Sequence, residues 1–559
     1  MANNNNKNRD FEKNNADLDS KNNSNKRQNG RNNRKNGRNT TNRRSFNDPS
    51  WYAKTPQLLI DSSSLAYQYA LGSPLTIEYL KPTIPADKKF HQYVDEYFAD
   101  ERETKWRGSM PGIWTIGIVP TYGVCNSPVS AANISARNLY SFVRHANSGH
   151  TNYEAADLML YILAMDSIFS LYQHCARAYG VMRLYSQDNR YLAKALVTAM
   201  GFDYDDLSSQ MADFRAFINL IAVKASAYKV PADFTMYIRH MWMYANIFAD
   251  SNSPKAQSYL FVPDGFWQYE EYQGAGKLVF KAFGGAKKLA HLKSYVNALF
   301  NPIIASEDCN IMSGDIQKAF GEKCFGLSTI AEDYSVGISY NPEVLEQIHN
   351  ARAYELDRTI EITQDVDVGS ATEGCILYQP KVSYTIGGNN SIKSPIVDRV
   401  SMVLDLGYHA PEPGINMVAT RLWPTIGNGA LNGTGYTADI LSCGSEIPVR
   451  FEIYEFDADH ALQSTEFTSN VGFNFTGTTV NPEAAAAQIG QVIRMFNDVE
   501  RFDCHPFISF ASNVITATET TQYAPEESGD TTVMTLVTKE DLRKMHDTAI
   551  LSELNVPAY

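Results

Sequence analysis

The chain has 559 residues, of which 44% are hydrophobic and 20% are charged; this is an ordinary globular composition and excludes a collagen, a coiled coil or a mucin-like stalk. At ~100 to 200 residues per domain, the length allows two to four domains. The formal net charge of −13 is unevenly distributed: residues 1–44 carry 12 basic and four acidic side chains, a net charge of +8, and the rest of the chain carries −21. A cationic arm is thus joined to an acidic body.

The arm has a composition that predicts disorder. Residues 1–44 contain 16 asparagines but only five hydrophobic residues, too few to bury the apolar surface that offsets the entropy lost on folding. From Lys21 to Arg44 there are nine basic side chains and no acidic one. Such runs usually contact a polyanion, and a tail that only increases solubility is the alternative. We expect residues 1–50 to form a disordered basic arm.

Residues 51–357 have the periodicity of helices and are expected to form a mainly helical domain. The longest expected helix covers 153–180, begun by a capping box between Thr151 and Glu154 and ended by Gly180. Its side chains are apolar on nearly every face, so it should be buried on most sides. The other expected helices cover 86–99, 132–146, 187–200, 208–227, 233–249, 287–300 and 342–356.

From residue 358 to 537 the pattern changes to short β-prone segments separated by Gly, Asn and Pro, which predicts a smaller β-rich domain. Residues 449–453 alternate between apolar and charged side chains, so one face of that strand should be buried and the other wet. Together with the helical region, this pattern predicts an α+β fold. The expected strands cover 359–366, 381–386, 401–406, 449–456, 513–518 and 531–537.

Cap residues predict where further helices begin. Pro342 and Pro482 each follow an asparagine, the order typical of an N-cap and the first helical residue. The second of them should open a helix over 483–502 within the β-rich region. Thr538 is expected to cap a last helix, so that 538–559 form a C-terminal helical segment.

Two motifs suggest nucleotide chemistry, but each lacks a residue that the chemistry needs. The segment 273–277 is Gly-rich like a phosphate-binding loop, yet Glu271 stands where the first glycine is needed and Leu278 where a hydroxyl ligand of magnesium is needed. Asp315 is followed by Ile316 rather than by the second aspartate that a template-directed polymerase uses to hold metals. We expect an ordinary turn at the first motif and no polymerase site at the second.

Three other groups of residues are better explained by packing than by chemistry. His145 and His150 are five residues apart around a loop, so they do not share a helix face as metal ligands would. Cys504 and His505 are adjacent on an extended segment and should point to opposite faces, which separates a nucleophile from its base. The aromatic and methionine side chains of 237–248 predict a core or a subunit contact rather than base stacking. No catalytic residue, metal site or cofactor is predicted.

Cysteine spacing and hydropathy indicate the compartment. The seven cysteines are spread singly with no CxxC pair, which argues against a disulfide framework or a zinc ribbon and favours a reducing compartment. The N-terminus lacks the apolar core of a signal peptide, and the longest strongly apolar run, Leu158–Met165, is too short to span a bilayer. We expect a soluble protein with no stable membrane anchor.

A long and specific resemblance lies in the sequences NLYSFVRHANSGH at 138–150, NYE at 152–154 and DLMLYILAMDS at 157–167. These segments closely resemble picobirnavirus capsid proteins, and outside 110–180 the resemblance is architectural. It implies an icosahedral shell of capsid-protein dimers around double-stranded RNA, with a helix-rich shell domain and a smaller protruding domain. It also implies loss of an N-terminal peptide by self-cleavage in some relatives, but no motif here places such a site.

The residues and the resemblance together predict a structural capsid protein rather than an enzyme. The expected partners are other copies of the chain and viral RNA, in a virion assembled in the host cytoplasm. A nucleoprotein that coats single-stranded RNA is the alternative, but it would need a basic groove in a body that is acidic. The side chains expected to contact RNA are Lys21, Lys26, Arg27, Arg31, Arg34, Lys35, Arg38, Arg43 and Arg44.

Overall fold

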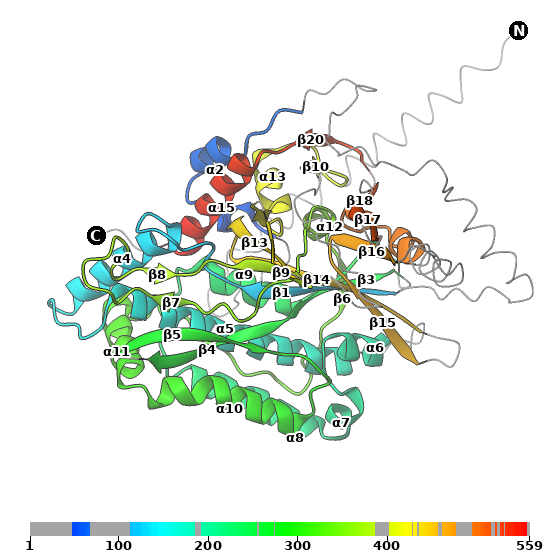
Figure 1. The fold of residues 1–559 in the computed structure, drawn as a ribbon. Helices are drawn as coiled ribbons and strands as arrows, with labels where there is room; N and C mark the ends of the chain where they lie inside the picture. Colours follow the sequence, from blue (N-terminus) through cyan, green and yellow to red (C-terminus); the bar gives the residue numbers. More distant parts are fainter. Residues whose placement is uncertain are drawn as a thin grey trace, which may run out of the picture. The chain divides into compact units, whose positions relative to one another are not determined.

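The structure is a computed structural model, and it describes thirteen stretches of the chain (Figure 1). The nine cations expected to contact RNA, the helix expected over 86–99 and the first part of the helix expected over 483–502 lie outside them. The described residues are 47–67, 112–184, 192–253, 256–272, 274–385, 402–427, 429–432, 435–456, 461–476, 495–515, 520–522, 526–529 and 531–555.

A six-stranded sheet runs through the middle of the body in the order β15-β14-β1-β3-β2-β6. Its inner strand β1 (Ile113–Pro120) pairs antiparallel with β14 (Glu446–Phe456) and parallel with β3 (Ser258–Pro263). β15 pairs antiparallel with β14, β2 antiparallel with β3, and β6 parallel with β2. The remaining strands of the sheet are β2 (Ile247–Ala249), β6 (Ile338–Tyr340) and β15 (Leu462–Phe467).

Strand β1 is buried along its whole length because a hydrophobic cluster covers each face of the sheet. Trp114, Ile116 and Ile118 point into one cluster, and Ile113 and Val119 point into the other. A strand that is apolar on both faces carries no apolar–polar alternation, and none of the strands β1 to β6 was predicted from the sequence. Residues 51–357 are mainly helical, as expected, but they also contribute strands that the sequence did not predict.

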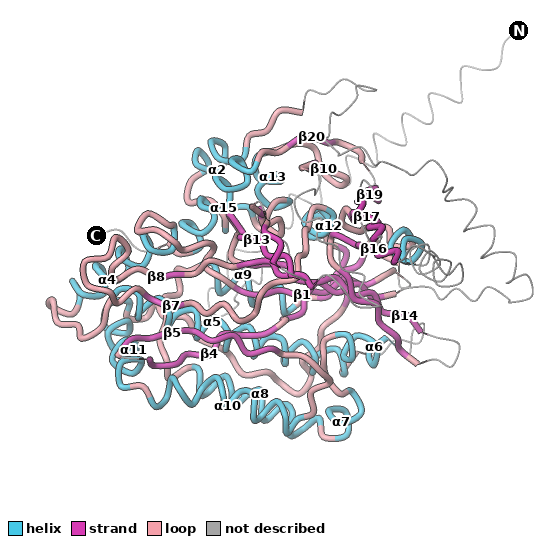
Figure 2. The backbone as a smooth tube through the Cα atoms, in the orientation of Figure 1, coloured by secondary structure: helices cyan, strands magenta, loops and turns pink. Residues whose placement is uncertain are grey.

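Strands from both sides of residue 357 share this sheet, as Figure 2 shows where they run together through the middle of the body. β14 and β15 come from 358–537, the region expected to protrude, and they continue the sheet formed by β1 and β3. Residues 46–559 accordingly group into one compact unit. The boundary expected at 357/358 crosses a shared sheet, and 446–467 belong to the main body.

The longest helix, α5 (Ala155–Met182), confirms the buried helix expected over 153–180, but both of its ends differ from the prediction. Glu154 is the N-cap and forms the capping box with Asp157, whose carboxylate accepts the Glu154 N–H at 3.1 Å. The predicted box with Thr151 is wrong because the Thr151 hydroxyl bonds to the hydroxyl of Tyr140 instead, at 2.8 Å. Gly180 lies inside the helix and does not end it. The close approach of Val336, which leaves no room for a Cβ, explains the glycine.

Among the described residues, α5 is the one helix long and apolar enough to cross a membrane by length and composition. Its most apolar window is 94% buried inside the structure, where α5 packs against α4, α8, α9 and the β4–β5 hairpin. The helices of the described residues are η1 (Pro49–Trp51), α2 (Pro56–Ser63), α4 (Ala131–Ala146), α5, α6 (Leu192–Ala199), α7 (Tyr204–Ser209), α8 (Met211–Ala225), α9 (Thr235–Ala245), α10 (Leu289–Ala305), α11 (Glu307–Phe320), α12 (Pro342–His349), α13 (Pro413–Ala419) and α15 (Lys539–Glu553).

Several expected helices have different bounds from those predicted. The helix expected over 233–249 ends at Ala245, because the next residues pair with β3 as strand β2. The helix expected over 208–227 is divided at Gln210 into α7 and α8, and α12 ends at His349 rather than at 356. Helix α11 was not predicted, although Ser306 caps it. The predicted caps of α12 and α15 are confirmed.

The other strands form small sheets around the main one, in keeping with an α+β fold. Strand β14 shows the predicted alternation, with Val449, Phe451 and Ile453 buried. Of the strand expected over 359–366, only β7 is present. The remaining strands are β4 (Gly265–Tyr272), β5 (Ala275–Ala282), β7 (Thr363–Gln364), β8 (Ile376–Leu377), β9 (Lys381–Thr385), β10 (Val403–Asp405), β11 (Thr425–Ile426), β12 (Ala430–Asn432), β13 (Gly435–Ser442), β16 (Asn470–Thr476), β17 (Ile508–Ile515), β18 (Thr520–Gln522), β19 (Glu526–Ser528) and β20 (Met534–Leu536).

Candidate functional site

The described chain begins at Asn47, within the arm expected over 1–50, and these first residues are fixed in the body, so the expected arm extends too far by four residues. The side-chain amide of the fully buried Asn47 donates to Gln347 Oε1 at 3.1 Å, and the Tyr52 hydroxyl donates to Asn47 Oδ1 at 2.6 Å. Trp51 packs edge-on against Trp242, with ring centroids 5.7 Å apart. We call Asn47, Trp51 and Tyr52 the anchor, because they attach the preceding chain to one place on the body.

Six charged side chains lie next to the anchor, and none of them is more than 1% exposed. Arg239 Nε on α9 donates to Glu446 Oε1 on β14 at 2.7 Å, and Arg239 Nη2 donates to Gln347 Oε1 at 3.0 Å. His240 Nδ1 lies 2.6 Å from Asp166 Oδ2 on α5. We call this set the buried charge cluster; its members are Asp166, Arg239, His240, Arg421, Glu446 and Glu553.

Within the cluster, neighbouring charges and burial act in opposite directions on the pKa values. Burial alone would lower the pKa of His240, but the carboxylates of Asp166 and Glu446 outweigh it and raise that pKa to about 9. Burial raises the pKa of Asp166, and the nearby His240 limits the rise. Burial would also raise the pKa of Glu446, but Arg239 and His240 lower it. His240 is therefore the protonated partner near neutral pH.

Glu553 completes the cluster from the last turn of α15. Burial, followed by the charge of Glu446, raises the pKa of Glu553 to about 7. The guanidinium of Arg421 opposes this rise, and it lies over the ring of Tyr52 at 5.3 Å from the ring centroid. The cluster thus ties α5, α9, β14 and α15 to the anchor. Because it is closed to solvent, it offers a substrate no access and has a structural role.

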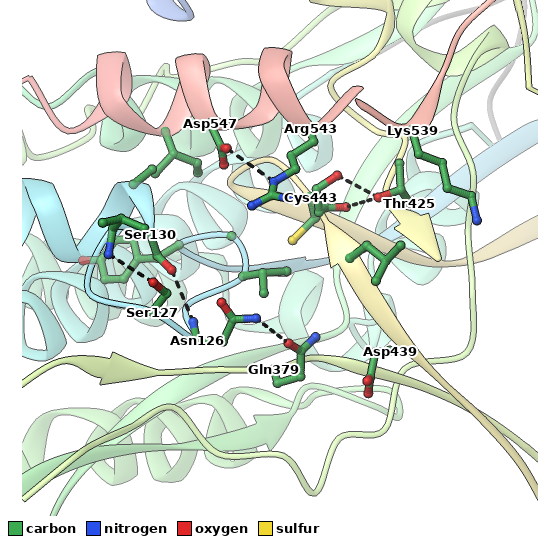
Figure 3. A pocket seen from close by; sticks show the side chains of 18 of the residues that line it. Asn126, Ser127, Ser130, Gln379, Thr425, Asp439, Cys443, Lys539, Arg543 and Asp547 are labelled. Atoms are coloured by element: carbon green, nitrogen blue, oxygen red, sulfur yellow. Dashed lines mark hydrogen bonds and ion pairs between the residues drawn. The ribbon is translucent and has the colours of Figure 1, made fainter. Parts of the chain in front are cut away.

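Figure 3 shows a pocket of about 410 Å³ between the β1–α4 connection, β13 and α15. Its polar side chains bond to one another: Asn126 Nδ2 donates to Gln379 Oε1 at 3.1 Å, and Arg543 Nε lies 3.9 Å from Asp547 Oδ2. Lys539 Nζ donates to a backbone carbonyl at 2.7 Å. These groups are engaged with one another or with the backbone, and the Lys539 bond links α15 to β11.

One serine–histidine pair lies at the edge of this pocket. Ser442 Oγ is 3.1 Å from His546 Nδ1 and 2.7 Å from Thr425 Oγ1. A nucleophile–base pair needs a third group to orient the histidine and an approach for the substrate. In the part of the chain that the structure describes, His546 Nε2 has no hydrogen-bond partner, and Ser442 is only 4% exposed. The pair is a packing contact.

The motifs singled out in the sequence are structural where the structure describes them. Gly274, with φ +79°, makes the turn of the β4–β5 hairpin, as expected for an ordinary turn. Cys504 Sγ donates to the carbonyl of Leu345, whereas His505 Nδ1 bonds to that of Pro506, so the two side chains have separate partners. The aromatic side chains of 237–248 are in the core.

Metal and disulfide chemistry find no support in the described stretches. They contain no group of three His, Cys, Asp or Glu side chains placed to hold a metal ion. All seven cysteines are described and all are free. Burial raises the pKa of the thiols of Cys125, Cys175, Cys443 and Cys504, which keeps them protonated and unreactive.

Comparison with known proteins gives the family. The model of the family "Picobirnavirus, Capsid protein" matches residues 51–435, which is more than half of the chain. The chain belongs to the picobirnavirus capsid protein family. A relative from human picobirnavirus, named capsid protein precursor, is 28% identical over 537 residues. The alignment covers 91% of this chain and 91% of the relative. The chain therefore has a structural role in the virion.

The fold of this picobirnavirus capsid protein matches a solved structure. The crystallographic structure of the picobirnavirus capsid aligns with a TM-score of 0.67 and 22% identity, over 91% of this chain and 98% of the other. A probable sugar isomerase from Mesorhizobium japonicum is 30% identical over 132 residues, but these are 22% of this chain and 30% of the isomerase. The full-length relatives are capsid proteins, which are not enzymes.

Proposed function

We propose that this capsid protein self-assembles as dimers into an icosahedral shell that encloses double-stranded RNA, with the basic arm contacting the RNA. Family membership supports self-association in a virion. The observation that carries the RNA contact is the charge asymmetry: an arm of +8 leads into a fixed anchor on a body of −21. Assembly in the host cytoplasm, as the cysteines favour, is part of the proposal.

The anchor supports a division of labour between arm and body. Fully extended, 44 residues span roughly 150 Å at ~3.3 to 3.6 Å each, so an arm that starts at Asn47 reaches RNA well inside a shell. An acidic body repels phosphates and leaves the genome to the arm. Lys and Arg on a flexible segment bind the RNA backbone rather than base edges, so packaging does not depend on sequence.

We also propose that the protruding part comes from within 358–537, outside the strands β14 and β15. Two small sheets in this region support the proposal: β9, β11, β12 and β13 form one, and β16 to β19 form another. Loops between such strands carry Gly, Asn and Pro, as exposed connections do. The shell wall is then built from 51–357 together with the two strands that complete its sheet.

RNA content of assembled particles tests the proposal. Full-length chains and chains lacking residues 1–44 are expressed side by side, and both are expected to form particles, because the anchor and the body are unchanged. The truncated particles should lose most of their RNA. RNA binding by the full-length chain should weaken with salt, with a slope of about 0.9 per neutralised phosphate.

Equal RNA content in the two kinds of particle would show that the body holds the genome. Flexible filaments on single-stranded RNA, instead of closed particles, would favour a nucleoprotein. Full-length chains that stay monomeric across salt and pH in light scattering would refute self-assembly.

A further inference from the structure

The loop between β7 and β8 is acidic and exposes apolar side chains. Residues 365–373 include three acidic residues, Asp365, Asp367 and Glu373, and no basic one. Val366 is 54% exposed and Val368 is 92% exposed. A single exposed valine is common on protein surfaces. Here two exposed valines alternate with carboxylates on one loop. This surface is complementary to an apolar groove with basic edges.

The loop is held in one conformation by its own side chains. The Asp365 carboxylate accepts hydrogen bonds from the hydroxyls of Ser370 and Thr372 and from the backbone N–H of Asp367 at 3.0 Å. The two hydroxyls and this N–H lower the pKa of Asp365, so it stays ionised. Val368 is thus presented on a fixed turn, and little entropy is lost when a partner covers it.

A groove of about 470 Å³ between α8 and α10 has the complementary character. Its floor is apolar and includes Val296 and Leu220, the latter 49% exposed. Lys224 and Lys293 line it, and neither has an ion-pair partner among the described residues. Its one carboxylate, Asp213, stands at the other end of α8, about 16 Å from Lys224 at 1.5 Å per residue.

The charge of the groove lining also differs from that of the rest of the body. The lining has two lysines and one carboxylate, in a body whose net charge is −21. The pocket of Figure 3 differs, since its charged lining has three carboxylates and two cations and would repel an acidic loop. Charge complementarity therefore selects the α8–α10 groove as the site for the loop.

We propose that loop 365–373 of one copy docks into the α8–α10 groove of a second copy, with Val366 and Val368 on Leu220 and with Asp367 beside Lys293. In Figure 1 the β4–β5 hairpin lies between β7 and α8, which favours a contact between two copies over one within a chain. The contact joins two different surfaces, and such heterologous contacts extend dimers into larger assemblies. This inference rests on the proposed self-assembly and identifies two surfaces through which the copies contact each other.

Charge reversal with compensation tests the contact. Lys293→Glu and Asp367→Lys should each raise the protein concentration needed for assembly by roughly tenfold or more, because each replaces an attraction by a repulsion. The double variant Lys293→Glu with Asp367→Lys should return toward the wild-type concentration. Lys318→Glu, on the exposed face of α11 away from the groove, is the matched control and should assemble like wild type. Both groove and control sites are exposed, and circular dichroism checks that each variant is folded.

Normal assembly of folded Lys293→Glu chains would overturn this contact and leave the proposed function standing. A double variant no better than the single ones would also overturn it. Failure of the wild-type chain to assemble would overturn both.

Disulfide trapping gives a second, independent measurement. Val368→Cys combined with Leu220→Cys should form disulfide-linked chains in oxidised particles, since linkage needs Cα atoms within about 7 Å. Val129→Cys combined with Leu220→Cys is the control, because Val129 is also exposed, at 76%, and lies outside the groove. Equal linkage in the two variants on non-reducing gels would contradict the proposed contact.

Discussion

At the scale of single residues, the buried charge cluster is costly to form and more costly to break. Taking ions out of water carries a penalty of several kcal/mol per ion, which close partners repay. The planar guanidinium of Arg239 donates to Glu446 Oε1 and to Gln347 Oε1 at the same time. Since Gln347 also accepts from Asn47, the cluster couples the core to the anchor.

Removing the cation should therefore destabilise the body strongly. Arg239→Met keeps the apolar stem but removes the cation closest to the buried carboxylate of Glu446, and we expect it to lower the free energy of unfolding by about 3 to 5 kcal/mol. Lys318→Met on the exposed face of α11 should change it by less than ~0.5 kcal/mol. Urea denaturation of disassembled protein measures both variants, and equal stability of the two would contradict this role of Arg239.

The same cluster predicts that stability falls as the pH rises. Burial raises the pKa of Glu553 to about 7, and Asp166 and Glu446 raise that of His240 to about 9. Both pKa values are higher in the folded chain, so between about pH 4.5 and pH 9 these two groups together bind more protons in the folded chain than in the unfolded one. Each group should contribute about 3 kcal/mol that is present at low pH and lost as the pH passes its folded pKa.

Glu553→Gln isolates one group, because glutamine resembles the neutral carboxyl and does not ionise. The free energy of unfolding of this variant should lose the part of its pH dependence that lies between about pH 4.5 and pH 7. Glu540→Gln, exposed in the same helix, should keep the wild-type profile. Identical profiles for all three proteins would show that Glu553 does not titrate in this range.

At the scale of elements, two glycines in helices illustrate opposite constraints. A Cβ on Gly180 of α5 would lie 2.6 Å from Val336 Cγ2 and 3.0 Å from the Val336 backbone N. Gly314 of α11 has nothing within 4 Å. The first glycine lets the segment around Val336 cross the helix closely, and the second has no such neighbour.

We expect alanine at these two positions to have effects of opposite sign. Gly180→Ala should destabilise the protein by about 1 to 3 kcal/mol, because the added methyl group displaces the segment that crosses α5. Gly314→Ala should stabilise it by about 0.5 to 1 kcal/mol through helix propensity alone. Thermal unfolding measures the stability of the two variants. If both were more stable than wild type, the segment around Val336 would move aside at no cost, and the prediction for Gly180 would be wrong.

Local signals in the sequence predicted local structure, and they failed where the fold depends on distant residues. The caps at Pro342 and Thr538 and the alternation in β14 were correct, since each is a property of a few neighbouring residues. Strand β1 was missed, because both of its faces are covered by segments hundreds of residues away. Asp166 directly follows the apolar run Leu158–Met165, but its partner His240 on α9 is visible only in the fold.

At the scale of the whole molecule, the two parts of the chain are joined by a sheet rather than by a linker. This arrangement predicts the order in which a protease cuts assembled particles. The Gly/Asn-rich segment 387–390, which lies outside the described residues, and the connection around Gly427 should be cut before α5, which is almost wholly buried. Mass spectrometry of the first fragments measures the order, and early cuts within 155–182 would refute the proposed layering.

The pairing of β1 with β14 also affects how the protein is made. Thr115 and Glu452 face each other in the sheet although 337 residues separate them in sequence. At ~5 to 20 residues per second, a ribosome needs roughly 17 to 70 s to synthesise that interval. Until then β1 lacks one neighbour, and Glu553 joins the buried charge cluster later still, after α15 has been synthesised. Chains interrupted before Glu553 cannot close this core, so we expect them to be excluded from assembly.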